Sequence, residues 1–213
     1  MYHRQLTKAG AILQVIAHRG ASAYAPENTF ASFDLALAMG AHALETDVQA
    51  TSDGVLVLMH DTSVDRTTDG HGPVSDLTYA EVAALDAGSW YASRFADERV
   101  PTLEGFLDRY GRRTEYALEL KQSGIEENVL AAVRARGLLD CVTFTSFSFA
   151  ACRTIRALDA EARVGFLFGR TTPDLLHQLV AIGCQQACPR ASTLAPDDVE
   201  AIRSHDLCIR TWG

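Results

Sequence analysis

The sequence lacks long apolar runs and is poor in basic residues. No stretch approaches the roughly 20 apolar residues that a transmembrane helix needs, and the first ten residues do not combine a basic segment with an apolar core. Its 213 residues include 19 Lys and Arg against 27 Asp and Glu, a formal net charge of −8. This balance argues against a nucleic-acid surface and a basic membrane-binding face. We therefore expect no secretory signal, no membrane span and no nucleic-acid partner.

Cysteine is also scarce and odd in number. Its scatter among apolar residues favours buried reduced thiols in a cytoplasmic protein over a disulfide framework. Cys184 and Cys188 are four residues apart, but no second pair lies nearby, so a zinc site is disfavoured. The five positions are Cys141, Cys152, Cys184, Cys188 and Cys208.

Apolar runs alternate with helix-like segments along most of the chain. Strands are expected over 12–17, 43–48, 55–59, 116–121, 141–147, 163–168, 186–188 and 207–212. Helices are expected over 26–39, 102–110, 128–136, 149–158, 173–182 and 196–204. About eight strands separated by helices predict a parallel sheet in an α/β fold, and favour a TIM-type β/α barrel over a short open sheet.

The pattern changes between residues 62 and 100. Polar residues, Gly and Pro dominate there, and one short helix is signalled by a capping box of Thr78 with Glu81. Trp90, Tyr91 and Phe95 would supply a small apolar centre. With no repeat, low-complexity tract or linker elsewhere, we expect a single barrel domain over residues 1–213 with an insertion at about 62–100.

Two acids interrupt the apolar strand Leu44-Glu45-Thr46-Asp47-Val48. Successive side chains of a strand point to opposite faces, so Glu45 and Asp47 share a face. Two neighbouring carboxylates in a buried strand persist only with a partner such as a cation, whereas on an edge strand both would be hydrated. The strand itself leaves these two alternatives open.

More polar residues occur where other predicted strands end. In parallel α/β folds the active site forms at the carboxyl ends of the strands. His18 and Arg19 end the first predicted strand and His60 and Asp61 the third, while Glu119 and Lys121 share a face of the fourth. Together with the acidic strand these residues predict one site, in which Glu45, Asp47 and Glu119 make an all-oxygen set that suits Mg²⁺ or Ca²⁺.

Each side chain also has a simpler interpretation. His18 and His60 are favoured as catalytic because they end strands beside the acids; the other histidines, His3, His42, His71, His177 and His205, are expected to be ordinary surface or core residues. Arg19 and Lys121 either contact phosphate, which we favour, or neutralise carboxylates as structural ion pairs. Asp61 either orients a neighbouring group or caps a turn.

Several segments in order resemble the glycerophosphodiester phosphodiesterase family. The match is nearly continuous from Ile16 to Lys121 and weaker to Trp212. It rests on His18-Arg19-Gly20, Pro26-Glu27-Asn28-Thr29, Glu45-Thr46-Asp47, Asp53-Gly54, His60-Asp61, Asp65-Arg66-Thr67-Thr68-Asp69-Gly70, Leu85-Asp86-Ala87-Gly88-Ser89-Trp90, Val100-Pro101-Thr102-Leu103 and Leu118-Glu119-Leu120-Lys121.

This resemblance implies a distorted TIM barrel with an inserted subdomain and hydrolysis of glycerophosphodiesters to glycerol 3-phosphate and an alcohol. It further implies that Glu45, Asp47 and Glu119 hold one divalent cation. His18 and His60 would be the general acid/base pair, and Arg19 and Lys121 would bind phosphate. A lysophospholipase D-type activity and a non-catalytic binding barrel are the alternatives.

The sequence departs from the family at its end. Family members usually continue past the Thr211-Trp212 strand with a helix and a last strand, whereas this chain stops at Gly213. We therefore expect a barrel that is incomplete at the C-terminus, or one that closes without that unit or with a partner.

Overall fold

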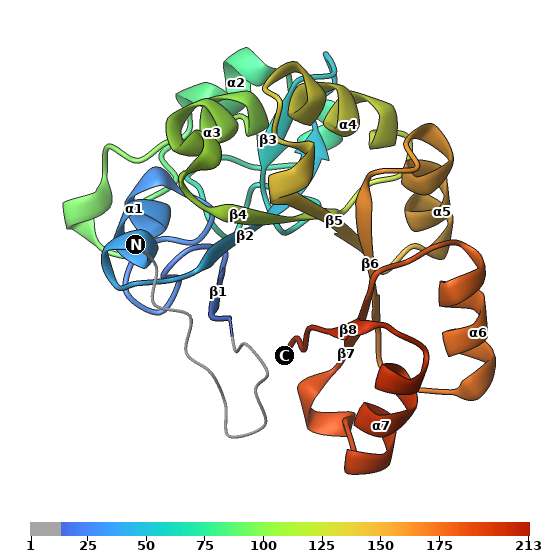
Figure 1. The fold of residues 1–213 in the computed structure, drawn as a ribbon. Helices are drawn as coiled ribbons and strands as arrows, with labels where there is room; N and C mark the ends of the chain where they lie inside the picture. The colour runs from blue at the N-terminus through green and yellow to red at the C-terminus, as the bar shows by residue number, and fades with distance from the viewer. Residues whose placement is uncertain (1–13) are drawn as a thin grey trace. The chain divides into compact units, whose positions relative to one another are not determined.

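The structure is a computed structural model that describes residues 14–213. The chain divides into two compact units, the first ending at Leu118 and the second comprising Glu119–Gly213 (Figure 1). His3 and the start of the first predicted strand lie outside the described residues. The single domain over 1–213 stays a prediction.

The first unit is built around strand β2 (Ala43–Ala50). Strand β1 (Ile16–His18) pairs parallel to it, with His18 opposite Glu45, and β4 (Glu115–Leu120) follows β2 in the strand order. All eight residues of β2 are buried. The strand is therefore central to its unit, and its polar side chains must find partners within the protein.

Strand β3 (Leu56–Leu58) runs antiparallel to β2, with Leu58 opposite Val48. The expectation that it joins the parallel strands was wrong. Only a tight turn separates the two strands, with Gly54 at φ +83° and the Thr51 hydroxyl accepting the Val55 amide. A parallel connection needs a crossover of a dozen or more residues, so this connection forms a hairpin.

Helices α1 (Phe30–Ala38) and α3 (Leu103–Tyr110) pack through aromatic side chains, with the Phe33 and Phe106 ring centroids 4.6 Å apart. Helix α1 starts later than the predicted Pro26, because Thr29 is its N-cap and accepts the Ser32 amide. The preceding Asn28 has φ +55° and cannot belong to the helix. The segment before α1 is therefore a loop.

The predicted insertion contains two 3₁₀ turns, Val74–Asp76 and Ser93–Phe95, and helix α2 (Tyr79–Ala84) with the expected Thr78–Glu81 capping box. The Tyr91 ring does contact both Trp90 and Phe95 edge-to-face, but Trp90 is exposed. The buried centre consists mainly of small aliphatic side chains: Val57, Met59, Val64, Val74, Val82, Ala87 and Val100. Because Val57 and Met59 come from the β3 segment, the insertion packs onto that hairpin.

The second unit alternates strands with helices: α4 (Glu126–Ala135), β5 (Val142–Ser146), α5 (Phe149–Leu158), β6 (Arg163–Phe168), α6 (Pro173–Ala181), β7 (Gln186–Pro189), α7 (Pro196–Ser204) and β8 (Cys208–Ile209). Strands β5 to β8 are parallel in chain order. Helices α5, α6 and α7 lie on the same side of these strands (Figure 1). The repeated strand–helix unit confirms the predicted α/β class and β/α-barrel type, distorted by the antiparallel β3.

None of the five cysteines, all of which lie within the described residues, forms a disulfide, and Cys141 is only half-buried although it was expected to be buried. Cys152, Cys184 and Cys188 are buried as expected, and burial raises the pKa of Cys152 and Cys188 to about 12. Cys208 was expected to be buried but is exposed, because it lies on the two-residue strand β8. None of the described helices is long and apolar enough to cross a membrane.

Candidate active site

The two acids of β2 are inside the protein. Glu45 is 2% exposed and Asp47 is fully buried, so the hydrated edge-strand alternative is wrong. Each offers a carboxylate oxygen within 4.8 Å of the other. At this separation two buried carboxylates repel each other strongly and need positive charge or hydrogen-bond donors close by.

Asn28 supplies one of those donors. Its amide nitrogen donates to Asp47 Oδ2 at 3.0 Å, while its carbonyl oxygen accepts from Thr46 Oγ1 at 2.7 Å. All three side chains are buried. Sequence reasoning missed Asn28, because Pro26-Glu27-Asn28-Thr29 was interpreted as a helix start. The available signal was the residue type, since Asn tolerates the left-handed conformation that ends a loop.

Arg19 contacts both acids from the end of β1. Its backbone amide donates to Glu45 Oε2 at 2.9 Å from a left-handed conformation with φ +56°. Its guanidinium lies 3.2 Å from Asp47 Oδ2 and 3.0 Å from Glu27 Oε1. Arg19 thus neutralises carboxylates as the structural alternative expected, and its side chain remains 16% exposed. Phosphate binding by Arg19 remains a prediction.

His18 precedes Arg19 and is the last residue of β1. Its side chain is open to solvent on one side, yet the packing around the rest of the ring and the adjacent Arg19 charge lower its pKa below 6.5. His60 adds a smaller repulsion in the same direction, and the negative charges of Asp47 and Glu27 oppose the shift. A neutral imidazole at neutral pH can accept a proton.

His60 is fixed by its neighbours on both sides. Gln49 of β2 donates to the carbonyl oxygens of Met59 at 2.8 Å and Asp61 at 2.6 Å. The ring Nδ1 lies 2.6 Å from Asp61 Oδ1. Because an ionised carboxylate only accepts, Nδ1 bears the proton and Nε2 is left for chemistry. Asp61 therefore orients a neighbouring group, which was one of its two expected roles.

Arg66 holds Asp61 in its ionised form. A hydrogen bond from Arg66 Nε at 2.6 Å is the main reason that the Asp61 pKa falls to about 2, although partial burial opposes the shift. Arg66 also donates to both oxygens of Glu27, at 3.0 Å and 2.8 Å. Burial raises the Glu27 pKa, but the hydrogen bonds and charges of Arg66 and Arg19 outweigh it and lower that pKa overall. Sequence reasoning quoted Glu27 and Arg66 only as parts of longer segments and gave them no role.

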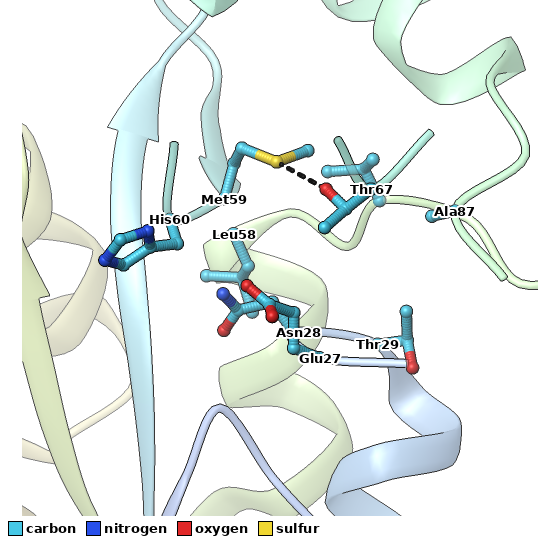
Figure 2. Close-up of a pocket in the computed structure, with 9 residues that line it drawn as sticks. Glu27, Asn28, Thr29, Leu58, Met59, His60, Thr67 and Ala87 are labelled. Carbon is cyan, nitrogen blue, oxygen red and sulfur yellow. Dashed lines mark hydrogen bonds between the residues drawn. The ribbon is translucent and has the colours of Figure 1, made fainter. Parts of the chain in front are cut away.

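Figure 2 shows how the loop before α1 meets the end of β3. The side chains of Glu27 and Asn28 point toward the Leu58–His60 segment, and Thr67 donates to the Met59 sulfur at 3.2 Å. These residues border a cavity of about 10 Å³, which has room for one water molecule. The first unit thus brings five of the predicted residues together: His18, Arg19, Glu45, Asp47 and His60.

The two remaining predicted residues belong to the second unit. Glu119 and Lys121 lie at the end of β4, where Lys121 Nζ is 2.9 Å from Glu119 Oε1. The Glu119 side chain is 9% exposed and that of Lys121 is 18% exposed. A hollow of about 290 Å³ lies beside them and is bordered by Ser146 and Phe147 at the end of β5. Its volume suits a small molecule.

Comparison with known proteins agrees with this chemistry. The model of the glycerophosphoryl diester phosphodiesterase family matches residues 18–213. The glycerophosphodiester phosphodiesterase of Caldanaerobacter subterraneus subsp. tengcongensis is 34% identical over 93% of this chain and 84% of its own length. A relative from Bacillus subtilis (strain 168) is 54% identical over 55% of this chain, and this match covers 50% of the relative's own length.

Solved structures extend the likeness to the fold. An Oleispira antarctica phosphodiesterase, determined in complex with the product sn-glycerol-3-phosphate, is 33% identical and superposes with a TM-score of 0.85, covering 94% of this chain and 84% of that one. Acids, histidines and basic residues at strand ends are the chemistry that such a phosphodiesterase needs. The chain belongs to the glycerophosphoryl diester phosphodiesterase family and is a phosphoric diester hydrolase.

Proposed function

We propose that the protein hydrolyses glycerophosphodiesters to glycerol 3-phosphate and an alcohol, in a reaction that depends on a divalent cation and on His18 and His60. The observation that supports this most directly is the buried pair Glu45 and Asp47, with the oriented His60–Asp61 pair in the same unit. The product bound to the Oleispira relative is a glycerol phosphate, which fits the substrate class.

The formal charges of the site favour a divalent cation. In the first unit, four carboxylates, Glu27, Glu45, Asp47 and Asp61, meet two guanidinium groups, those of Arg19 and Arg66. Four negative and two positive charges leave an excess of two negative charges. Two of the four carboxylates, Glu45 and Asp47, are deeply buried. The atoms that Glu45 and Asp47 can offer to a metal ion are carboxylate oxygens, which Mg²⁺ and Ca²⁺ prefer as ligands.

We propose that Glu45, Asp47 and Glu119 would hold the cation, Mg²⁺ or Ca²⁺. Glu119 and Lys121 add one charge of each sign, so the excess of two negative charges is unchanged. When bound, the cation would neutralise the phosphodiester anion and acidify a hydroxyl group or water. Arg19 and Lys121 are proposed to bind the non-bridging phosphate oxygens, Arg19 by exchanging part of its contact with Asp47 for the substrate.

The two histidines are proposed to move the protons. One takes a proton from the attacking oxygen while the other protonates the leaving alkoxide, which are the general-base and general-acid roles that imidazole groups can perform. For His60 the reacting atom is Nε2, because Nδ1 is committed to Asp61. We further propose a cytoplasmic location, a setting that agrees with five cysteines that form no disulfide.

The decisive experiment supplies glycerophosphocholine and lysophosphatidylcholine with and without EDTA, and measures glycerol 3-phosphate and choline. Asp47→Asn is the site variant and Asp76→Asn, at an exposed position, the control. We expect glycerol 3-phosphate and choline from glycerophosphocholine alone, abolished by EDTA, restored by Mg²⁺ or Ca²⁺ and absent in Asp47→Asn. Release of choline from the lysolipid would instead support the lysophospholipase D-type activity, and no turnover with any divalent ion would overturn the proposal.

A further inference from the structure

Arg66 makes two forked contacts with carboxylates from different parts of the chain. Its Nε and Nη2 lie 2.6 Å and 3.2 Å from the two oxygens of Asp61. Its Nη1 and Nη2 lie 3.0 Å and 2.8 Å from the two oxygens of Glu27. Arg66 lies in the loop after β3, and its guanidinium connects that loop to Glu27 in the loop before α1, 39 residues earlier in the chain. Only arginine offers donors in this fixed fork.

Each carboxylate that Arg66 holds touches a residue of the proposed reaction. Asp61 Oδ1 lies 2.6 Å from His60 Nδ1, and Glu27 Oε1 lies 3.0 Å from Arg19 Nη1. Arg66 is therefore one carboxylate away from the proposed acid/base and one carboxylate away from the proposed phosphate ligand. The order of contacts is Arg19–Glu27–Arg66–Asp61–His60.

We infer that Arg66 is a positioning residue, which sets the orientation of His60 through Asp61 and of Arg19 through Glu27. This inference rests on the proposed function for its effect on rate. Without Arg66, Asp61 can rotate away from Nδ1, and the His60 ring is then free to change tautomer or turn. Glu27 in turn loses its fixed direction and releases Arg19 toward Asp47.

The alternative is that Arg66 forms an ordinary surface ion pair. Its side chain is 44% exposed, and exposed pairs stabilise proteins little. Arg109 provides a matched control, because its side chain is 47% exposed and also forks onto a carboxylate, that of Asp34. Asp34 and Arg109 lie on α1 and α3, and their side chains bond to each other and contact Phe30 and Tyr110, which lie outside the candidate site.

The kinetic test compares Arg66→Ala, Arg66→Lys and Arg109→Ala in the metal-loaded enzyme, with melting temperatures recorded for each. We expect Arg66→Ala to lower kcat/KM by about 10- to 100-fold, as for other residues that orient a reacting group. Low millimolar guanidinium should restore part of this activity, because the exposed site admits a free guanidinium ion. Arg66→Lys should stay slow, since an ammonium group cannot fork, and Arg109→Ala should stay within about twofold of wild type.

Two results would overturn the inference: Arg66→Ala and Arg66→Lys with activity close to wild type, or a loss in Arg66→Ala that guanidinium does not restore. If Arg66→Ala does not fold, the activity of Arg66→Lys and of a double variant with Asp61→Asn still tests the positioning role. Asp61→Asn removes only the route from Arg66 to His60. Adding Arg66→Lys should therefore cost less than it does in wild type, and the remaining loss reports the route through Glu27 to Arg19. Fully multiplicative losses would contradict a shared route.

A spectroscopic readout separates this inference from the proposed function. In ¹⁵N spectra of the histidine rings, with His60 assigned through His60→Gln, wild type should show the Nδ1–H tautomer and Arg66→Ala a mixture of tautomers. Identical His60 signals in both proteins would reject the positioning role, even in an active enzyme. A wild type without phosphodiesterase activity but with the tautomer change would reject the proposed function alone.

Discussion

At the scale of single residues, His60 and His18 differ in how tightly each is held. The backbone on either side of His60 is held by Gln49, which donates to the Met59 and Asp61 carbonyls, and its ring is held by Asp61. His18 ends β1 beside Arg19, where its backbone pairs with β2 and its carbonyl accepts from the Ser22 hydroxyl at 2.9 Å, while its side chain is exposed. The His60 ring is thus preorganised for proton transfer, whereas the His18 ring has more freedom to follow a substrate.

The first residue-level prediction concerns both histidines. His18→Ala and His60→Ala should each lower kcat by about 10²- to 10⁴-fold, because each removes a proton-transfer step. Both should still bind Mg²⁺ or Ca²⁺, since neither is a proposed ligand. Glycerol 3-phosphate release measures the rate and calorimetry the metal. His71→Ala is the control at an 87% exposed side chain, and near-normal turnover in either site variant would remove that histidine from the mechanism.

The residues that sequence analysis missed share one property. Asn28, Glu27 and Arg66 each depend on at least one contact that spans 18 to 39 residues, whereas Glu45 and Asp47 stand out within a five-residue segment. A carboxylate pair in an apolar strand violates a local pattern and is therefore visible. Glu27 beside Pro26 instead fits a helix start well, and nothing local shows that Arg66 will meet it. Such long-range pairs are decided by the tertiary structure.

At the scale of elements, the turn between β1 and α1 fixes the acid-binding amide of Arg19. Gly20 has φ +81°, and a Cβ there would lie 2.3 Å from Ser32 Oγ and 2.7 Å from the Ser32 backbone carbon. The Ser32 hydroxyl donates to the Arg19 carbonyl at 3.0 Å. The close approach of this glycine to α1 therefore holds Arg19 in its left-handed conformation.

We predict that Gly20→Ala destabilises the protein more than Gly54→Ala. Gly54 has nearly the same φ, +83°, but nothing lies within 4 Å of an added Cβ. Gly54→Ala should therefore cost only backbone strain, about 1–2 kcal/mol, and Gly20→Ala should cost about 1–3 kcal/mol more through overpacking. Urea denaturation of both variants measures the difference. Equal losses would mean that the contact with α1 is unimportant.

Element boundaries followed from the sequence where the chain is regular. The expected ranges of α5, β6 and α7 agree residue for residue with the structure, because Pro, Gly and apolar spacing mark their ends. Strand β3 was predicted at the right place but with the wrong direction, because the residues of a strand do not show whether it pairs parallel or antiparallel. The signal lay in the Ser52-Asp53-Gly54 turn, which is too short to return the chain for parallel pairing.

At the scale of the whole molecule, ionised carboxylates in the first unit stabilise the native chain in a pH-dependent way. Asp61 has a pKa of about 2 in the folded protein against an ordinary value of 3.8, and the Glu27 pKa is lowered as well. A carboxyl group whose folded pKa is depressed stabilises the native state above its ordinary pKa. That contribution is lost as the pH falls through the folded value.

We therefore predict that the free energy of unfolding rises between about pH 2 and pH 4, and that part of this rise disappears in Asp61→Asn. The amide cannot ionise, so the variant should be less stable than wild type at pH 7 and should approach it near pH 2. Urea denaturation at a series of pH values measures both proteins, with Asp76→Asn as the exposed control. Because Arg66 is the main cause of the Asp61 shift, Arg66→Lys should also flatten the curve. A stability difference between wild type and Asp61→Asn that stays constant from pH 2 to pH 7 would show that the Asp61 charge does not stabilise the fold. The ion pair between Asp61 and Arg66 would then make no contribution to stability.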